Sequence, residues 1–306
     1  MGIDFNGRVA IVTGAGGGLG REHALALAAR GAKVLVNDFG GTVDGGGASP
    51  AAQRVADEIA AAGGTALANG ASVTDAVAVE AMVAQAMAAW GRVDILVNNA
   101  GILRDRSFAK ITFDDFRAVL DVHLMGAVHC TKAVWDAMRA QEYGRIVMTT
   151  SSSGLYGNFG QSNYGAAKMA LVGLMQTLSI EGARHGIRVN CLAPTAATRM
   201  TAGLLPEPVL ALLEPGAVTP GLLHLCGQDA PNRTILCAGA GTFECAHVTL
   251  TRGAFVGNGA DAAEQVAARF AEIASRDGET VPQSGAEQGT NEVGQAMRAA
   301  GAAGSR

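Results

Sequence analysis

The sequence predicts an α/β protein with a doubly wound parallel sheet, in which helices cover both faces of the sheet. Short runs of apolar, often β-branched residues alternate with Ala-rich amphipathic segments along the chain. Most residues of each run are apolar, as in strands that are buried on both faces, and the segments between them have the roughly ten or more residues of a crossover helix. The length of 306 residues is enough for a full buried core.

The elements can be placed in chain order from these two patterns. Strands are expected where the runs are apolar, at 9–12, 34–36, 65–69, 93–97, 145–148, 188–192 and around 234–238. Helices are expected in the Ala-rich segments, at about 18–30, 51–62, 75–90, 114–139 and 162–184.

Two segments interrupt the alternation. Residues 39–50 form a Gly-rich loop, and 195–220 contain four prolines without a clear period, which suits a mobile lid over a substrate.

We expect a single main domain over residues 1–257 and a C-terminal helical extension and tail over 258–306. In the extension, Asp261 and Glu264 resemble a capping arrangement, and apolar side chains share one helix face up to a stop at Gly278. That helix would dock on its own domain or on a partner subunit. The last ~25 residues are polar and rich in Gly and Ala, and would form an arm or be disordered.

Composition and charge exclude several classes of protein. Acidic residues outnumber basic ones by 27 to 23, and no basic stripe with interleaved aromatics is present, so a nucleic acid partner is not expected. No apolar run reaches the roughly 18 residues of a membrane span. The five cysteines contain no C-x-x-C pair, which argues against a disulfide framework and a zinc site. The cysteine pattern therefore predicts no metal. The N-terminal residues also lack a basic, signal-like region, so we expect a cytoplasmic protein.

A glycine-rich turn, TGAGGGLG at 13–20, lies between the first expected strand and the first expected helix. Glycines let the backbone approach a pyrophosphate without Cβ collisions, and the free N–H groups at the helix start attract its charge. In a chain with 42 glycines such a cluster could also be only a turn. As part of a dinucleotide site, the turn would use Gly14, Gly16, Gly17, Gly18, Leu19 and Gly20.

Asp38 strengthens the dinucleotide interpretation. It ends the second expected strand, 18 residues past Gly20, where a carboxylate can accept both hydroxyls of the adenosine ribose. The same charge repels the 2′-phosphate of NADP, and no Arg or Lys follows at 39–50 to bind one. Asp38 could instead cap a loop, but that leaves its spacing from the glycines unexplained. The expected cofactor is NAD.

Tyr164 and Lys168 are four residues apart and therefore share one face of an expected helix. Both types are rare, with three Tyr and four Lys in the chain, which makes the spacing informative. A secondary alcohol needs a base when hydride leaves it, and a nearby ammonium makes a phenol a better base by lowering its pKa. Ser151 follows the strand upstream and could donate to the substrate oxygen, although with Ser152 and Ser153 it could also begin a polar loop.

Four motifs in this order, TGAGGGLG at 13–20, NNAG at 98–101, Ser151 and the Tyr-x-x-x-Lys at 164–168, resemble those of the short-chain dehydrogenase/reductase family. The likeness covers about residues 5–257. It implies catalysis by the Ser, Tyr and Lys, an NAD(P) cofactor, a sheet of about seven strands, and homodimers or homotetramers. It also implies that the cofactor contacts Ser72, Val73, Asn99, Ala100, Gly101, Tyr164, Lys168, Pro194, Thr195 and Thr198.

Three positions depart from the pattern of the family. Ser72 stands where Asp commonly lies over the adenine, and Thr195 stands where Gly commonly follows Pro194. On the long central helix, His123 replaces an Asn that works in the family chiefly through its main-chain carbonyl. His123 could supply the same carbonyl, could itself accept a proton in a catalytic relay, or could be a packed side chain.

Within the family, the segments 101–108 and 156–161 resemble the (3R)-hydroxyacyl-CoA dehydrogenase part of peroxisomal D-bifunctional proteins and their bacterial single-domain relatives. That likeness implies a (3R)-3-hydroxyacyl-CoA substrate. A hydroxysteroid or steroid side chain is the alternative, and a catalytically idle NAD-binding sensor is a remote one. Arg104 and Arg199 could hold the phosphates of the acyl-CoA, and Tyr156 could line the substrate site. An ion pair with Asp105 or a contact with another subunit is the alternative explanation of the arginines.

Overall fold

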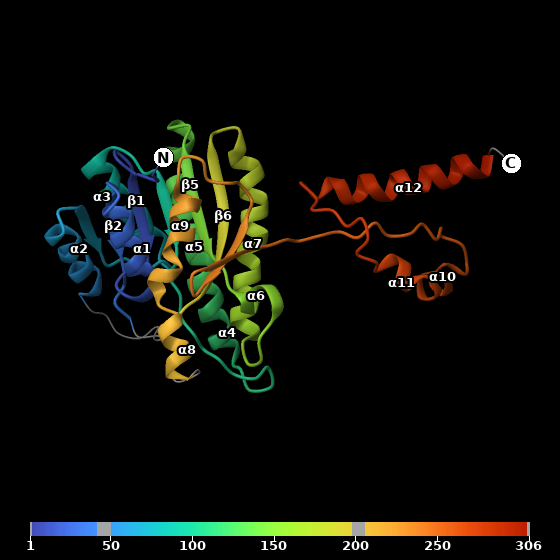
Figure 1. The fold of residues 1–306 in the computed structure, drawn as a ribbon, viewed down its shortest axis with the longest axis horizontal. Helices are drawn as coiled ribbons and strands as arrows, with labels where there is room; N and C mark the ends of the chain where they lie inside the picture. Colours follow the sequence, from blue (N-terminus) through green and yellow to red (C-terminus); the bar gives the residue numbers. More distant parts are fainter. Residues whose placement is uncertain (1, 42–49, 198–205, 305–306) are drawn as a thin grey trace. The chain divides into compact units, whose positions relative to one another are not determined.

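The computed structural model describes residues 2–41, 50–197 and 206–304, and Figure 1 shows their fold. The strands are β1 (Val9–Thr13), β2 (Lys33–Asn37), β3 (Thr65–Asn69), β4 (Ile95–Asn98), β5 (Gly144–Thr149), β6 (Ile187–Thr195), β7 (Ile235–Gly239) and β8 (Thr242–Ala246). The helices up to β8 are α1 (Gly18–Ala28), α2 (Ala51–Ala61), α3 (Ala76–Trp90), α4 (Phe113–Leu120), η1 (Asp121–Met125), α5 (Gly126–Ala140), α6 (Ser152–Tyr156), α7 (Ser162–Ala183), α8 (Glu207–Leu212), η2 (Pro215–Ala217) and α9 (Thr219–Cys226).

The strands form one sheet in the order β3-β2-β1-β4-β5-β6-β7-β8, and β1 to β7 all pair in parallel. The order reverses direction beside β1, because that strand pairs with both β2 and β4. In such sheets, ligands bind outside the carboxyl ends of the strands at the point of reversal. The predicted α/β class is therefore confirmed, and the sheet order itself indicates where a site should lie.

β8 is a strand that the sequence prediction missed, so the sheet has eight strands in the described residues and not about seven. A connection of two residues, Ala240 and Gly241, joins it to β7, which requires the two strands to be antiparallel. Both connecting residues have positive φ, 49° and 76°, as a hairpin turn of type I′ demands. The strand was missed because most of its residues are exposed, so it has no apolar run to reveal it.

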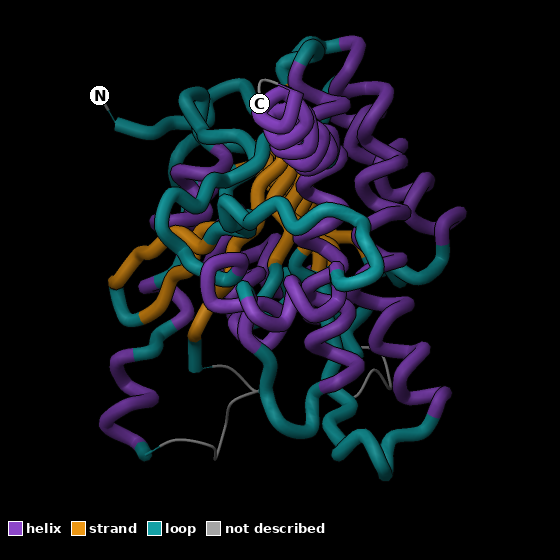
Figure 2. The backbone as a smooth tube through the Cα atoms, turned by 90° about the vertical axis from the view of Figure 1, so that its right-hand side faces the viewer, coloured by secondary structure: helices purple, strands orange, loops and turns teal. Residues whose placement is uncertain are grey.

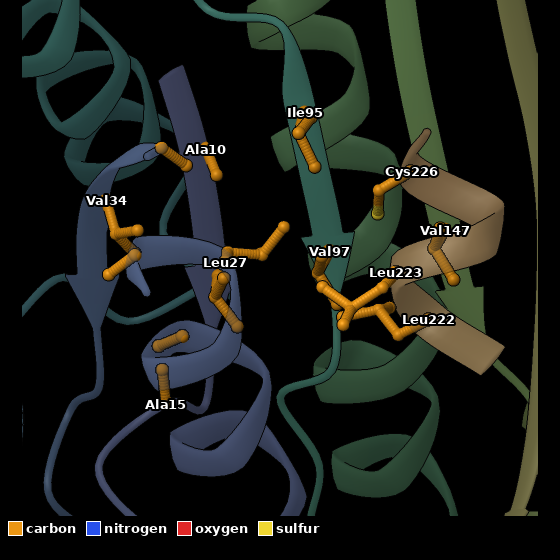
Figure 3. Close-up of a cluster of buried hydrophobic side chains, with 14 of the residues drawn as sticks. Ala10, Ala15, Leu27, Val34, Ile95, Val97, Val147, Leu222, Leu223 and Cys226 are labelled. Carbon is orange, nitrogen blue, oxygen red and sulfur yellow. The ribbon is translucent and has the colours of Figure 1, made fainter. Parts of the chain in front are cut away.

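Helices cover both faces of the sheet (Figure 2). α1, α2 and α9 share a hydrophobic cluster with one face, and Figure 3 shows Leu27, Val97 and Leu222 among its members. α3, α5 and α7 pack on the other face; α7 alone buries eight residues along its length, Leu171 and Met175 among them. A fully buried side chain of this size contributes roughly 1.5–3 kcal/mol to folding, so α7 is firmly anchored over several turns.

The helix expected over 114–139 is divided into three pieces. α4 leads into η1, a π-helical segment, and α5 continues from Gly126, whose N–H donates to the carbonyl of Asp121 five residues back. A π-helical segment adds a residue to a helical turn and is frequent at functional sites. Hydrophobic periodicity does not reveal it, because the extra residue depends on the surrounding packing. η1 contains His123.

His23 on α1 is a buried histidine that connects α1 to α9. Its Nδ1 lies 3.0 Å from the hydroxyl of Thr219 at the start of α9, and its Nε2 is buried without a hydrogen-bond partner among the described residues. Burial lowers the pKa of His23 to about 3, because the charged imidazolium would lose its water. The folded protein therefore holds this imidazole neutral.

We expect the His23 imidazole to make stability depend on pH. Its folded pKa is below the unfolded value of about 6.5, so its full contribution to the free energy of unfolding is present above that pH and is lost as pH falls toward 3. The loss has a slope of up to about 1.4 kcal/mol per pH unit. Urea unfolding of the protein and of a His23→Gln variant between pH 7.5 and 5 measures it. The variant should lose less stability on acidification, and parallel pH dependences would contradict the assignment.

Contacts between Cα atoms divide the chain into two compact units, Met1–Cys245 and Ala246–Arg306. The second unit holds α10 (Ala262–Ala268), α11 (Phe270–Ile273) and α12 (Ala286–Gly304). The side chain of Asp261 makes no capping hydrogen bond, and the helix that it precedes ends at Ala268. α12 replaces the expected arm. The boundary predicted at residue 257 stays a prediction.

Among the described residues, no helix is long and apolar enough to cross a membrane. The same residues contain no group of three or more His, Cys, Asp or Glu side chains that could hold a metal ion.

Candidate active site

A cavity of about 660 Å³ opens at the carboxyl ends of the strands beside the point of reversal. This volume is in the range of small-molecule and cofactor sites. The predicted site residues that line it are Gly14, Gly17, Gly18, Leu19, Gly20, Asp38, Ser72, Val73, Asn99, Ala100, Gly101, Arg104, His123, Ser151, Tyr164, Lys168, Pro194 and Thr195. Residues that are far apart in the sequence thus share one cavity. Of the remaining predicted residues, Gly16 and Tyr156 are not in its lining, and Thr198 and Arg199 lie outside the described part of the chain.

The glycine-rich turn packs tightly on one side and is open on the other. Gly14 has a φ of +62°, and a Cβ there would lie 2.7 Å from the Cα of Ala100. A Cβ on Gly20 would lie 2.3 Å from the carbonyl oxygen of Gly14, so this glycine lets the start of α1 sit against the turn. A Cβ on Gly17, which lines the cavity, would meet nothing within 4 Å. The turn therefore leaves room where a pyrophosphate would approach the start of α1.

Gly16 acts through Asp38 and not by lining the cavity. Its N–H donates to Oδ2 of Asp38 at 2.7 Å, while the N–H of Gly40 donates to Oδ1 at 2.6 Å. A Cβ on Gly16 would lie 2.5 Å from the Cβ of Ala51 and 2.8 Å from the carboxylate of Asp38. Two backbone donors thus fix a carboxylate at the cavity wall. Asp38 is the acceptor that an adenosine ribose would need, and the cavity fits a dinucleotide.

Thr13 and Asn99 hold the turn against the end of β4. The hydroxyl of Thr13 accepts from the N–H groups of Asn99 and Ala100 at 3.0 and 3.1 Å. The side-chain amide of Asn99 donates to the carbonyls of Thr13 and Gly14 at 2.9 and 3.1 Å. These bonds hold the backbone of the glycine-rich turn against the end of β4. Asn99 therefore shapes the part of the cavity wall that would face the cofactor.

Two hydroxyl side chains, of Ser72 and Thr74, form part of the cavity wall. The hydroxyl of Ser72 lies 2.9 Å from that of Thr74, and both residues line the cavity. A hydroxyl both donates and accepts, whereas the Asp that Ser72 replaces could only accept. The structure thus brings Ser72 to the place expected for it, with a different hydrogen-bonding capacity.

Ser151, Tyr164 and Lys168 lie together in the same cavity. Ser151 caps α6 by accepting from the N–H of Ser153 at 3.2 Å, and its hydroxyl also hydrogen-bonds the phenol of Tyr164. The Nζ of Lys168 donates to the carbonyl of Thr149, at the end of β5, at 2.5 Å. It lies 5.5 Å from the centre of the Tyr164 ring. The predicted i, i+4 pair is therefore one cluster with Ser151.

Burial shifts both titratable groups of this cluster toward their neutral forms. It raises the pKa of the Tyr164 phenol, and the hydrogen bond from Ser151 opposes that rise. It lowers the pKa of Lys168 to about 7. The sequence predicts instead that Lys168 lowers the pKa of Tyr164. In the protein by itself burial raises this pKa, and the expected lowering, which also relies on the positive charge of a bound nicotinamide, stays a prediction.

His123 is buried beside Tyr164, and the planes of the two rings are nearly perpendicular, with centres 5.2 Å apart. Its Nε2 lies 2.8 Å from the carbonyl oxygen and 3.1 Å from the amide nitrogen of Ile102. Gly101 makes this contact possible, because a Cβ there would lie 2.3 Å from the imidazole. Burial, and then the charge of Lys168, lower the pKa of His123 well below its usual value. The imidazole is neutral.

The mouth of the cavity holds a polar network that the sequence did not reveal. Arg104 donates to Asp115 at 2.7 Å, so the ion-pair interpretation of this arginine is realised, although with a partner on α4. Asn163 donates to the carbonyl of Arg104 at 3.0 Å, and Gln161 donates to Asp105 at 2.7 Å. These contacts join residues more than 50 positions apart, and no local pattern predicts them.

Tyr156 is exposed and lies near Cys237 on β7, with which its hydroxyl makes a hydrogen bond. The structure does not bring it to the cavity. It is the last residue of α6.

Comparison with known proteins agrees with this site. A model of the short chain dehydrogenase family matches residues 8–207. The peroxisomal multifunctional enzyme type 2 of Drosophila melanogaster is 52% identical over 254 residues, which are 82% of this chain and 42% of the insect enzyme. A putative short-chain type dehydrogenase/reductase of Mycobacterium tuberculosis is 48% identical and covers 89% of this chain and 95% of its own. The chain thus spans less than half of the insect enzyme.

A solved structure is also similar in fold. It is a 7α-hydroxysteroid dehydrogenase complexed with NADH and 7-oxo glycochenodeoxycholic acid, with a TM-score of 0.70 and 29% identity. The match covers 78% of this chain and 95% of that one.

Proposed function

The chain belongs to the short-chain dehydrogenase family, whose members use NAD(P), and from that premise we propose that it is an NAD-dependent oxidoreductase of (3R)-3-hydroxyacyl-CoA substrates. The reaction would interconvert a secondary alcohol and a ketone. One observation carries the proposal: the hydrogen-bonded pair of Ser151 and Tyr164, with Lys168 beside it, lies in the same cavity as Asp38 and the glycine-rich turn.

In the oxidation, the substrate hydroxyl would lie between Ser151 and Tyr164. Ser151 donates a hydrogen bond to the substrate oxygen and orients it. Tyr164 takes the proton of the alcohol at its phenol oxygen, and Lys168 stabilises the phenolate that must form first. The bound nicotinamide supplies the hydride acceptor and a positive charge. That charge and the ammonium of Lys168 together would offset the burial that raises the Tyr164 pKa in the protein alone.

Asp38 supports NAD over NADP. Its carboxylate is fixed at the cavity wall by the N–H groups of Gly16 and Gly40, so it cannot turn away from a 2′-phosphate without breaking two hydrogen bonds. The described wall beside it, including Asn37 and Phe39, offers no cation to a phosphate.

The lining of the cavity supports this substrate class. It includes the apolar side chains Ile102, Leu103, Ala118 and Val122, which suit an acyl chain. Arg104 lies at the mouth and could exchange its bond to Asp115 for a phosphate of the CoA. The similarity to the peroxisomal multifunctional enzyme favours the same class. The similarity to a 7α-hydroxysteroid dehydrogenase keeps a hydroxysteroid as the second candidate.

An assay of NADH formation would test the proposal. We expect turnover of (3R)-3-hydroxyacyl-CoAs of several chain lengths with NAD, little with the (3S) isomers, and little with 17-hydroxysteroids. If the protein prefers a steroid, the proposed acyl-CoA substrate is wrong, while the proposed oxidation of a secondary alcohol still holds. NAD binding without turnover of either class would favour an idle sensor. We also propose, as part of this function, a cytoplasmic homodimer or homotetramer, which sedimentation of the purified protein would test.

A further inference from the structure

The order of the strands indicates where the adenosine half of a dinucleotide would lie. The glycine-rich turn follows β1, and Asp38 follows β2, the neighbour of β1. Lys168 contacts the end of β5, which lies on the other side of β1. A dinucleotide that places its nicotinamide near Lys168 and its adenosine ribose at Asp38 therefore extends its adenine toward the end of β3. The segment that follows β3 lines the cavity with residues 71–74, and we call these four residues the β3 wall.

Asn37, the last residue of β2, is a buried amide that reaches the β3 wall. Only 1% of the residue is exposed. Its Nδ2 donates to Oδ1 of Asn69 at 3.0 Å and to the carbonyl oxygen of Ala71 at 2.9 Å. A carbonyl can only accept, so the atom of Asn37 that faces Ala71 must be the nitrogen, and this fixes the orientation of the amide. Asn37 thus ties the β3 wall to the strand that leads into Asp38.

Asn69, the last residue of β3, completes the network. Its Oδ1 accepts from the N–H of Ala71 at 2.9 Å as well as from Asn37, and its own carbonyl accepts from the N–H of Asp38 at 3.0 Å. Its Nδ2 donates to Oε1 of Gln85 on α3 at 2.8 Å. Ala71 is therefore held at its N–H by Asn69 and at its carbonyl by Asn37. The start of the β3 wall and the backbone of Asp38 share one set of hydrogen bonds.

The other end of the β3 wall is held by α5. The Nδ1 of His129 lies 2.9 Å from the carbonyl oxygen of Val73. A Cβ on Gly126 would lie 2.6 Å from the Val73 side chain, so the wall and the start of α5 are in close contact. Ser72 lies between these two anchors and lines the cavity. Loss of the Asn37 amide would therefore release the start of the wall, while its end stays attached to α5.

We propose that Asn37 is a positioning residue for the adenosine end of the cofactor, because it holds the β3 wall at a fixed place relative to Asp38. The inference rests on the proposed NAD-dependent function. The partners of its amide, Asn69 and Ala71, lie at the end of β3, whereas Lys168 contacts the end of β5. The effect of Asn37 should therefore appear in the binding of the adenosine half and in KM for NAD, with kcat unchanged.

Two variants of similar size remove the donors of this amide. Asn37→Leu takes the donor away from the carbonyl of Ala71 and adds no charge, and Asn37→Asp places an acceptor there together with a negative charge. AMP is the probe, because it carries the adenosine half without the nicotinamide and its binding needs no turnover. We expect calorimetry to show that both variants bind AMP at least about tenfold more weakly, a change of about 1.4 kcal/mol. KM for NAD in alcohol oxidation should rise by a similar factor, with kcat within about twofold.

Gln141→Leu is the matched control. The amide of Gln141 also bonds a backbone, accepting from the N–H of Val93 at 3.2 Å and donating to its carbonyl at 2.8 Å, and neither residue is in the lining of the cavity. This variant should bind AMP as the unmodified protein does. If Asn37→Asp weakens AMP binding and Asn37→Leu does not, the added charge is the cause and the positioning role is wrong. If kcat falls by the factor by which KM rises in both variants, Asn37 supports the whole site and the positioning role is also wrong.

Hydrogen exchange tests the hold on the β3 wall in the protein without cofactor. Peptides that cover residues 70–75 should exchange faster in both Asn37 variants than in the unmodified protein, while those of β1 and β5 keep their protection. Equal exchange of this segment in all three proteins overturns the proposal. If the unmodified protein binds NADH and neither variant weakens AMP binding, only the positioning role is wrong. If the unmodified protein binds neither AMP nor NADH, the proposed cofactor is wrong, and the role of Asn37 is wrong with it.

Discussion

Tyr164→Phe should lower kcat by at least about 100-fold while NADH binding changes by no more than a few-fold. Phenylalanine keeps the ring that packs against His123 and fills the same buried space, so the substitution removes only the phenol oxygen. With that oxygen gone, Ser151 remains as the hydrogen-bond partner proposed for the substrate hydroxyl, and its hydroxyl is not a base near neutral pH. Steady-state rates and a fluorescence titration with NADH separate chemistry from binding.

Tyr143→Phe is the control for this experiment. The Tyr143 ring lies between the guanidinium groups of Arg8 and Arg145, at 3.6 and 4.1 Å from its centre, before the start of β5 and away from the cavity. Removing the hydroxyl of Tyr143 should leave kcat unchanged. Residual activity of Tyr164→Phe above about 1% would mean that another group takes the proton.

The second large effect is the choice of cofactor. The unmodified protein should prefer NAD to NADP by at least about 100-fold in kcat/KM, because placing a phosphate against the fixed carboxylate of Asp38 costs about 3 kcal/mol, at about 1.4 kcal/mol per factor of ten. Asp38→Asn removes the charge and keeps the size, and Asp38→Ala also removes the acceptors of the Gly16 and Gly40 N–H groups. Both variants should reduce the ratio of kcat/KM with NAD to kcat/KM with NADP, mainly because kcat/KM with NAD falls.

Values of kcat/KM with NAD and with NADP give this preference for each variant. Asp136→Ala is the control: it removes an exposed carboxylate on α5 and should leave the preference for NAD unchanged. Comparable rates of the unmodified protein with NAD and NADP would place the adenosine ribose away from Asp38.

The sequence predicted those features of the fold and the site that depend on residues close together in the chain. An apolar run of four residues is enough to place β1, and the spacing of Tyr164 and Lys168 is enough to put them on one face of α7. The resemblance to the short-chain dehydrogenases, drawn from four such local motifs, is confirmed. What the sequence could not predict depends on contacts between distant segments.

Gly16 illustrates the limit. Its contact with the cofactor stays a prediction, whereas its packing against the Cβ of Ala51 and the carboxylate of Asp38 depends on segments far away in the sequence. Tyr156 was placed in the site by resemblance and lies outside it, because α6 turns its side chain toward β7. The π-helical η1 has no signature in hydrophobic periodicity, yet it presents His123 to Ile102.

The anchoring of α7 links catalysis to the cooperativity of the fold. Tyr164 and Lys168 occupy the first two turns of a helix whose later turns are buried against the sheet down to Gly182. Elements packed in this way open only in the global unfolding reaction, whereas lids and loops open locally at little cost. The residues proposed to transfer the proton should therefore belong to the most slowly exchanging part of the molecule. Heat or denaturant should destroy it in the same transition that melts the sheet, with no partly folded, inactive form preceding it.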